Sequence, residues 1–180
     1  MRFVAPPWTL NASTTILRDR WIDLRADNCT TSAGVSIAPY YVLQYPDWAH
    51  VVCIDQQQRI CIVWQYRHGV GRTVAELPGG VVDPGEEPLA AAQRELREET
   101  GIVGTEWRAC GQFSTNPASH TNSIHVFACR VQSISTPRPD AAEDIRHDFL
   151  TIAQLREAIA GGEFAHMLHI GALCRGLDLI

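Results

Sequence analysis

The stretch that decides the fold is GVVDPGEEPLAAAQRELREETGI, residues 80–102. Residues 89–99 contain no Gly, Pro or β-branched side chain, so this part of the chain has high helix propensity. Pro88 suits the first helical position, and Gly101 suits the residue that ends a helix. The stretch therefore predicts a helix between these two residues, preceded by a tight turn at Gly79-Gly80.

Three carboxylates crowd the second half of this helix. At about 100° per residue, Glu95, Glu98 and Glu99 fall within an arc of roughly 100° on its surface. Like charges at these spacings repel each other, and a hard divalent cation such as Mg²⁺ or Mn²⁺ would relieve the repulsion. The alternative is a solvated acidic face that binds nothing. The residues on either side of the helix favour the metal-binding interpretation.

The spacing of the whole stretch resembles the Nudix box of the Nudix hydrolase family. Every position that the box specifies is filled here, by Gly80, Glu86, Arg94, Glu95, Leu96, Glu98, Glu99, Gly101 and Ile102. Weaker similarity extends over most of the chain from about Trp21, and it is closest to the ADP-ribose pyrophosphatase branch. The resemblance implies a hydrolase that cleaves the pyrophosphate bond of a nucleoside diphosphate linked to another group, most simply ADP-ribose or a similar nucleotide sugar.

The order of predicted strands and helices indicates an α/β protein. Strands before, between and after helices favour an α/β/α sandwich around a mixed sheet, which is also the Nudix fold. Residues 1–45 are expected to form an N-terminal extension, with a loose arm over residues 1–15 and a β-hairpin of strands at 18–25 and 35–45. Residues 46–180 are expected to form the hydrolase domain. In the resembling branch the N-terminal sheet contributes to a homodimer interface, so a homodimer is expected.

Composition narrows the class of protein further. The formal net charge of −5 argues against a general binder of nucleic acids or anionic membranes. No apolar run approaches the length of a membrane span. The six cysteines include no Cys-x-x-Cys pair, and several lie in apolar runs, as expected for reduced thiols of a cytoplasmic protein.

The resemblance also implies roles for the residues of the box. Glu95 and Glu99 would be the principal metal ligands, and Glu98 would be a third ligand or a base. The backbone carbonyl of Gly79 would be a further ligand, and Glu86 would act structurally. Arg94 stands four residues before Glu98, and this spacing suits an ion pair that orients the carboxylate.

Residues outside the box are candidates for substrate binding. Arg67 and Glu76 precede the box as they do in ADP-ribose pyrophosphatases, where the Arg binds a phosphate and the Glu lies near the metal site. The alternative for both is a surface ion pair. Pro117 stands sixteen residues after Gly101, a spacing that resembles the proline marking this branch.

The loop over residues 114–122 departs from the branch in its candidate base. Asn122 stands where the branch usually has a Glu, and a carboxamide cannot accept the proton of an attacking water in this pH range. His120 is one substitute, because the pKa of an imidazole suits base catalysis. Glu143 and Asp144 are others, whereas His125 is expected to be packed within a strand.

Tyr40, Tyr41 and Trp48 are candidates for stacking on a nucleobase, with core or interface packing as the alternative.

Two rival functions remain. The same metal-dependent hydrolysis could act on a dinucleoside polyphosphate, NADH or an oxidised nucleotide. A sensor that binds a nucleotide without hydrolysis is the second rival, and the complete box disfavours it.

Overall fold

The computed structural model describes residues 4–139 and 144–177, which form two compact units. One unit comprises the chain up to Tyr45 together with the loop Ser114–Asn122. The other comprises Pro46–Phe113 and the chain from Ser123 onward. Within the described ranges, no helix is long and apolar enough to cross a membrane.

The first unit is built on a three-stranded antiparallel sheet. Its strands are β1 (Thr9–Arg18), β2 (Asp23–Thr30) and β3 (Ser36–Leu43), in the order β1-β2-β3. The loop Ser114–Asn122 joins this unit at the end of β3, where Leu43 donates from its amide to the carbonyl of Ser119 over 2.8 Å. The N-terminal extension therefore has three strands, where a two-stranded hairpin was predicted.

Two details of the predicted extension are wrong. Residues 9–15 belong to β1 and are not a loose arm, and residues 18–25 are not one strand. The carboxylate of Asp19 accepts hydrogen bonds from the amides of Trp21 and Ile22, over 2.7 and 2.9 Å, and so stabilises a turn between β1 and β2. All ten residues of β1 are exposed, so the strand lacks the one-sided apolar alternation by which strands are recognised in a sequence.

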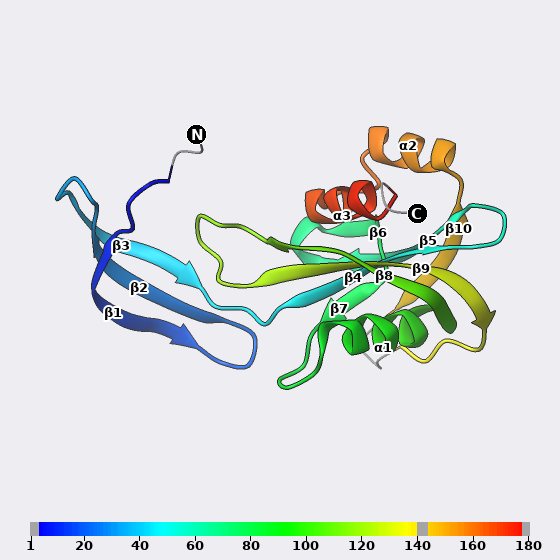
Figure 1. Ribbon diagram of the computed structural model, residues 1–180, viewed down its shortest axis with the longest axis horizontal. Coiled ribbons are helices and arrows are strands. Elements are labelled where there is room, and N and C mark those ends of the chain that lie inside the picture. Colours follow the sequence, from blue (N-terminus) through cyan, green and yellow to red (C-terminus); the bar gives the residue numbers. More distant parts are fainter. Residues whose placement is uncertain (1–3, 140–143, 178–180) are drawn as a thin grey trace. The chain divides into compact units, whose positions relative to one another are not determined.

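The second unit contains a seven-stranded mixed sheet with helices on both faces (Figure 1). Its strands are β4 (Trp48–Ile54), β5 (Ile60–Arg67), β6 (Arg72–Glu76), β7 (Gly79–Val81), β8 (Ile102–Ser114), β9 (Ser123–Ile134) and β10 (Ile145–Leu150). The sheet order is β10-β5-β4-β9-β8, and β6 pairs with β5 while β7 pairs with β4. Strands β4 and β9 are parallel, whereas β5 runs antiparallel to β4, β6 and β10.

Three α-helices cover this sheet. Helix α1 (Pro88–Thr100) lies on one face, and α2 (Ile152–Ala160) and α3 (Met167–Leu177) lie on the other, with a 3₁₀ turn at His68–Val70 between β5 and β6 (Figure 1). The predicted sandwich around a mixed sheet is thus confirmed.

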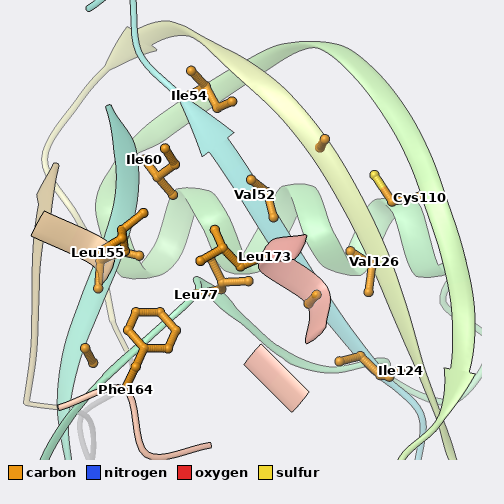
Figure 2. Close-up of a cluster of buried hydrophobic side chains, with 14 residues drawn as sticks. Val52, Ile54, Ile60, Leu77, Cys110, Ile124, Val126, Leu155, Phe164 and Leu173 are labelled. Carbon is orange, nitrogen blue, oxygen red and sulfur yellow. The ribbon is translucent and has the colours of Figure 1, made fainter. Parts of the chain in front are cut away.

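The alternation of β4 divides the core into two layers. Ala49, Val51 and Cys53 pack with Leu96 of α1 on one face of the sheet. On the other face lies the second cluster, shown in Figure 2, which contains Val52, Ile54, Ile60, Leu77, Leu155, Phe164 and Leu173. Because β4 is buried on both faces, it fixes the positions of α1 and α3 relative to one central strand.

The six cysteines are free thiols. Five are buried, and Cys174 on α3 is exposed. Cys53 and Cys129 lie side by side on the parallel strands β4 and β9. Their mutual hydrogen bond, together with burial, raises the pKa of the Cys129 thiol. Burial also raises the pKa values of Cys61 and Cys110.

Candidate active site

The site begins with the helix predicted from the sequence. Helix α1 starts at Pro88 and ends at Thr100, where Gly101 adopts the left-handed conformation with φ 73°. Its apolar side packs Ala91, Ala92 and Leu96 into the core, and Glu95 and Glu99 lie against the segment that precedes the helix. The box helix is therefore confirmed, and two of its acidic residues lie beside the turn at Gly79-Gly80.

Glu99 is the most deeply placed of the three carboxylates. Only 4% of its surface is exposed, and its Oε2 accepts a hydrogen bond from the amide of Gly79 over 2.9 Å. A carboxylate is costly to bury without partners, so this contact ties the end of α1 to the turn between β6 and β7. Glu99 and the Gly79 backbone thus form one structural unit.

Neighbouring atoms approach the backbone of both glycines of the turn closely. A Cβ on Gly79, which has a φ of +152°, would lie 2.1 Å from the carbonyl oxygen of Ala49. A Cβ on Gly80 would lie 2.5 Å from Oε1 of Glu95. Any side chain at either position would displace β4 or the Glu95 carboxylate, so the cradle around these acidic groups has room for glycine alone.

Arg94 connects the carboxylates of the box. Its Nε and Nη2 donate to the two oxygens of Glu86 over 3.0 and 2.9 Å, and Nη2 also donates to the carbonyl of Val81. Its Nη1 donates to Glu95 over 2.7 Å and to Glu98 over 3.2 Å. The hydrogen bond with Glu86, followed by that with Glu95, raises the pKa of Arg94 beyond its already high value, and the same contact lowers the pKa of Glu86.

The donor set of the box fits a hard divalent cation. Glu95 and Glu99 lie against one glycine turn, Glu98 is joined to Glu95 through Arg94, and carboxylate oxygen is the ligand that Mg²⁺ and Mn²⁺ prefer. Arg94 now supplies the positive charge between Glu95 and Glu98. Another group of possible metal ligands is more closely spaced than these three carboxylates. Within residues 4–139 and 144–177, one possible ligand atom from each of Glu76, His166 and His169 lies within 4.8 Å of the other two.

Arg67 and Glu76 form a strong ion pair next to the box. Nη2 of Arg67 donates to Oε2 of Glu76 over 2.6 Å, and its Nε is 3.0 Å from the same oxygen. The Glu76 side chain is 5% exposed and that of Arg67 is 47% exposed. The structure therefore brings these two predicted residues together, with a buried carboxylate that holds a half-exposed guanidinium.

The loop that carries Pro117, His120 and Asn122 belongs to the first unit. Pro117 is exposed, and Nδ1 of His120 lies 3.4 Å from the hydroxyl of Thr115. Asn122 is 2% exposed, and its Oδ1 accepts a hydrogen bond from the same hydroxyl over 2.6 Å. Asn122 is thus a buried structural residue of this loop.

The remaining candidates are dispersed. Tyr40 donates from its hydroxyl to the carbonyl of Ala118, and Tyr41 is 54% exposed. Trp48 is partly buried in β4. Asp144 is exposed just before β10, and Glu143 lies outside the described residues.

His125 lies in β9 with Nε2 2.9 Å from Oδ2 of Asp47. Desolvation raises the pKa of Asp47, but the Ser123 amide and His125 outweigh it, so the pKa is lowered on balance. His125 is therefore partly buried and held by a carboxylate, in a strand as predicted.

Sequence reasoning missed a group of histidines near Glu76. His50 of β4 and His169 of α3 are each 4% exposed, and their rings stack with centroids 4.1 Å apart. His166 precedes α3 and lies 5.0 Å from His169 between ring centroids. The His-x-x-His spacing of the last two was the available signal, but nothing in the sequence places His50 or Glu76 beside it.

A mixed sheet between helix layers, with a glycine turn that leads into a helix of clustered carboxylates, defines the architecture of a pyrophosphohydrolase of the Nudix type. The family description "NUDIX domain" matches residues 45–168, and "Nucleoside diphosphate sugar hydrolase N-terminal domain" matches residues 8–43. The chain therefore belongs to the Nudix family.

Similar proteins confirm the resemblance to the ADP-ribose pyrophosphatase branch. The chain is 30% identical to the ADP-ribose pyrophosphatase of Mycobacterium tuberculosis over 83% of this chain and 73% of that protein. It is 31% identical to the ADP-ribose pyrophosphatase of Bacillus subtilis over 57% and 56% of the two chains. A crystal structure described as an ADP compounds hydrolase shares the fold with a TM-score of 0.85 at 18% identity, and it covers 99% of this chain and 96% of its own.

Proposed function

We propose that this protein hydrolyses the pyrophosphate bond of ADP-ribose or a similar nucleotide sugar and that the reaction depends on a divalent metal ion. The observation that supports the proposal is the placement of Glu95 and Glu99 of α1 against the Gly79-Gly80 turn, with Glu98 joined to Glu95 through Arg94. The names of the two bacterial relatives support the choice of substrate.

The metal would be Mg²⁺ or Mn²⁺, held by Glu95, Glu99, Glu98 and the backbone carbonyl of Gly79. When bound, such an ion neutralises phosphate charge and lowers the pKa of a bound water. Arg94 holds Glu95 and Glu98 at one guanidinium nitrogen, so it would orient both carboxylates before the ion arrives. Glu86 in turn fixes Arg94 through two hydrogen bonds.

Arg67 would bind a phosphate oxygen of the substrate. A guanidinium matches phosphate oxygens with two parallel donors, and the side chain is half-exposed while Glu76 anchors it from within. Glu76 would therefore orient Arg67 and present its carboxylate near the metal site. Pro117 would mark the substrate side of the loop, as in the resembling branch.

The base that accepts a proton from water has four candidates. Glu98 lies within the box, His120 lies in the loop of the first unit, Asp144 precedes β10, and Glu143 lies outside the described residues. Asn122 cannot take this role, because a carboxamide does not ionise in the working range. Replacing each candidate in turn and comparing the pH dependence of kcat/KM would identify the base.

Residues 1–45 would form a dimerisation unit, and residues 46–180 the hydrolase domain. The first unit exposes large apolar side chains, including Leu10, Ile16, Leu17 and Trp21, which a second copy could cover. Six free thiols support a location in the reducing cytoplasm. Sedimentation at several protein concentrations, with and without residues 1–45, would test the dimer.

A substrate panel would test the proposed reaction. ADP-ribose, an ADP-sugar, NADH, a dinucleoside polyphosphate and an oxidised nucleotide would each be incubated with and without Mg²⁺ or Mn²⁺. We expect metal-dependent release of nucleoside monophosphate, with the highest kcat/KM for ADP-ribose. A protein that binds these nucleotides without turning over any of them would be a sensor and would contradict the proposal.

Variants of the box would link turnover to the carboxylates. Glu99→Gln and a Glu98→Gln, Glu99→Gln double variant should lower kcat by about 10²-fold or more, because charge stabilisation in the transition state is lost. Glu157→Gln, on the exposed side of α2, is the matched control. Wild-type rates in the Glu99 variant at saturating Mg²⁺ would remove the carboxylates from the mechanism.

A further inference from the structure

A second polar cluster lies in the hydrolase unit beneath the segment that carries Glu76. It contains His50 of β4, Glu76 at the end of β6, and His166 and His169 at the beginning of α3. Glu76, His50 and His169 are each 4% exposed, so the cluster is buried between the sheet and α3. Nε2 of His169 lies 3.9 Å from Oε1 of Glu76.

The residue types of the cluster are those of a metal site, but His169 uses one ring nitrogen to accept a hydrogen bond, whereas a metal-bound histidine normally donates one. The amide of Leu77 donates to Nδ1 of His169 over 3.0 Å, so a neutral His169 ring carries its hydrogen on Nε2. A histidine that ligates a metal through one nitrogen normally donates a hydrogen from the other. Ligation through Nε2 would require His169 to give up the Leu77 contact or to lose both ring hydrogens. Nε2 of His169 faces Glu76 at 3.9 Å, which is beyond the reach of a direct hydrogen bond.

Burial keeps His169 in the neutral form that this arrangement requires. Desolvation, followed by repulsion from His50, His166 and Arg67, holds the pKa of His169 well below its ordinary value. The same causes, with His166 and Arg67 as the neighbouring charges, lower the pKa of His50 to about 3. Near neutral pH His169 therefore accepts a hydrogen bond at Nδ1 and offers one at Nε2.

The backbone that His169 holds leads directly into the carboxylate site. After Leu77, the carbonyl of Pro78 accepts a hydrogen bond from the amide of Val51 over 2.9 Å. The amide of Gly79 then donates to Glu99 over 2.9 Å. A Cβ on Gly79 would overlap Ala49, so the segment packs directly against β4 at this point. A short backbone segment therefore links Glu76 to Glu99. His169 holds the beginning of this segment at the Leu77 amide, and Glu99 holds its end at the Gly79 amide.

We propose that His169 is a positioning residue, which fixes the Leu77 amide through Nδ1, so that helix α3 sets the geometry of the site formed by α1. The inference rests on the proposed function for its kinetic consequence, and the hydrogen-bonding pattern stands on the contacts alone. Leu77 and Leu173 of α3 lie in the same buried cluster (Figure 2), which holds the helix against the segment that it supports.

Three variants of His169 test the contact at Nδ1. His169→Phe keeps a ring that can stack on His50 and removes both nitrogens. His169→Asn retains an acceptor near the position of Nδ1, whereas His169→Gln places its amide near the position of Nε2 and does not restore that acceptor. His147→Phe on β10 is the matched control, because it makes the same chemical change outside the cluster.

Kinetics with ADP-ribose and Mg²⁺ form the first arm of the experiment. We expect His169→Phe to lower kcat about tenfold or more with KM within about twofold, because positioning acts on the reacting geometry and not on overall binding. His169→Asn should recover part of kcat, His169→Gln should not, and His147→Phe should match the wild type. Equal kcat values in the wild type and all three variants would overturn the proposal.

Nuclear magnetic resonance forms the second arm and does not depend on the substrate. In protein with ¹⁵N-labelled histidine, the ring signals of His169 should report hydrogen on Nε2 and a bare Nδ1. The amide signals of Leu77 and Gly79 should shift in His169→Phe, and that of Leu77 should shift less in His169→Asn. Hydrogen on Nδ1, or unmoved amide signals in the Phe variant, would overturn the proposal. A wild type that is inactive on every substrate would instead contradict the proposed function.

Discussion

Replacing His50 with Leu should make the protein less sensitive to acid. His50 is buried, and desolvation lowers its pKa to about 3, compared with 6.5 for an unperturbed histidine. Its Nδ1 is buried and has no hydrogen-bond partner among the described residues. The folded state therefore resists protonation of this ring, whereas the unfolded state accepts a proton once the pH falls below 6.5.

The sign and size of the effect follow from the two pKa values. Between pH 6.5 and pH 3 the unfolded state binds more protons than the folded state, so His50 lowers the free energy of unfolding as the pH falls. Each pH unit in this window removes about 1.36 kcal/mol. At pH 4.5 the loss relative to pH 8 is about 3 kcal/mol, which is a large part of a typical stability of about 5–15 kcal/mol.

Urea unfolding followed by circular dichroism at pH 8.0 and pH 4.5, in the presence of EDTA, measures this difference. Leu has nearly the volume of His, so we expect similar stabilities at pH 8.0 and a variant that loses about 3 kcal/mol less than the wild type at pH 4.5. His68→Gln, which removes an exposed histidine, should behave as the wild type does. If His50→Leu loses as much stability as the wild type between the two pH values, the reasoning is refuted.

Two further substitutions probe the box helix. Arg94→Lys should lower the free energy of unfolding in urea by about 1.5–3 kcal/mol and should also lower turnover, because an ammonium cannot reproduce the paired contacts with Glu86. Arg156→Lys on α2 is the control. Unchanged stability with full activity in the Arg94 variant would contradict the role of Arg94 in holding the carboxylates. Leu96→Ala should lower the free energy of unfolding by about 2.7–5 kcal/mol in the same assay, because Leu96 is fully buried under β4. A decrease below about 1 kcal/mol would mean that the core collapses around the smaller side chain.

The parts of the fold that the sequence predicted are those with local causes. Pro88 and Gly101 define the ends of α1 through their own backbone preferences, and the structure places the helix between them. Thr151 and Gln154 form a capping box at the start of α2, where the side chains of both residues bond to the backbone of the other. Such features depend on a few neighbouring residues and are therefore visible in one sequence.

The parts that the sequence did not predict depend on distant residues. Strand β1 is exposed along its whole length and exists because it pairs with β2, so its own residues give no alternating pattern. The cluster around Glu76 joins β4, β6 and α3 across the chain, and only the folded sheet brings His50 and His169 into contact. Arg67 and Glu76 were both predicted as site residues. That Glu76 is buried while Arg67 is half-exposed follows from the packing of β5 and β6.

The distribution of the thiols has a practical consequence for studying this protein. Of the six cysteines, Cys174 alone is exposed, and burial suppresses thiolate formation at Cys61, Cys110 and Cys129. A maleimide dye applied to the native chain should therefore attach at Cys174 on α3 without any engineered change. A fluorophore at that position would sit on the helix that carries His169 and could follow its movements during turnover.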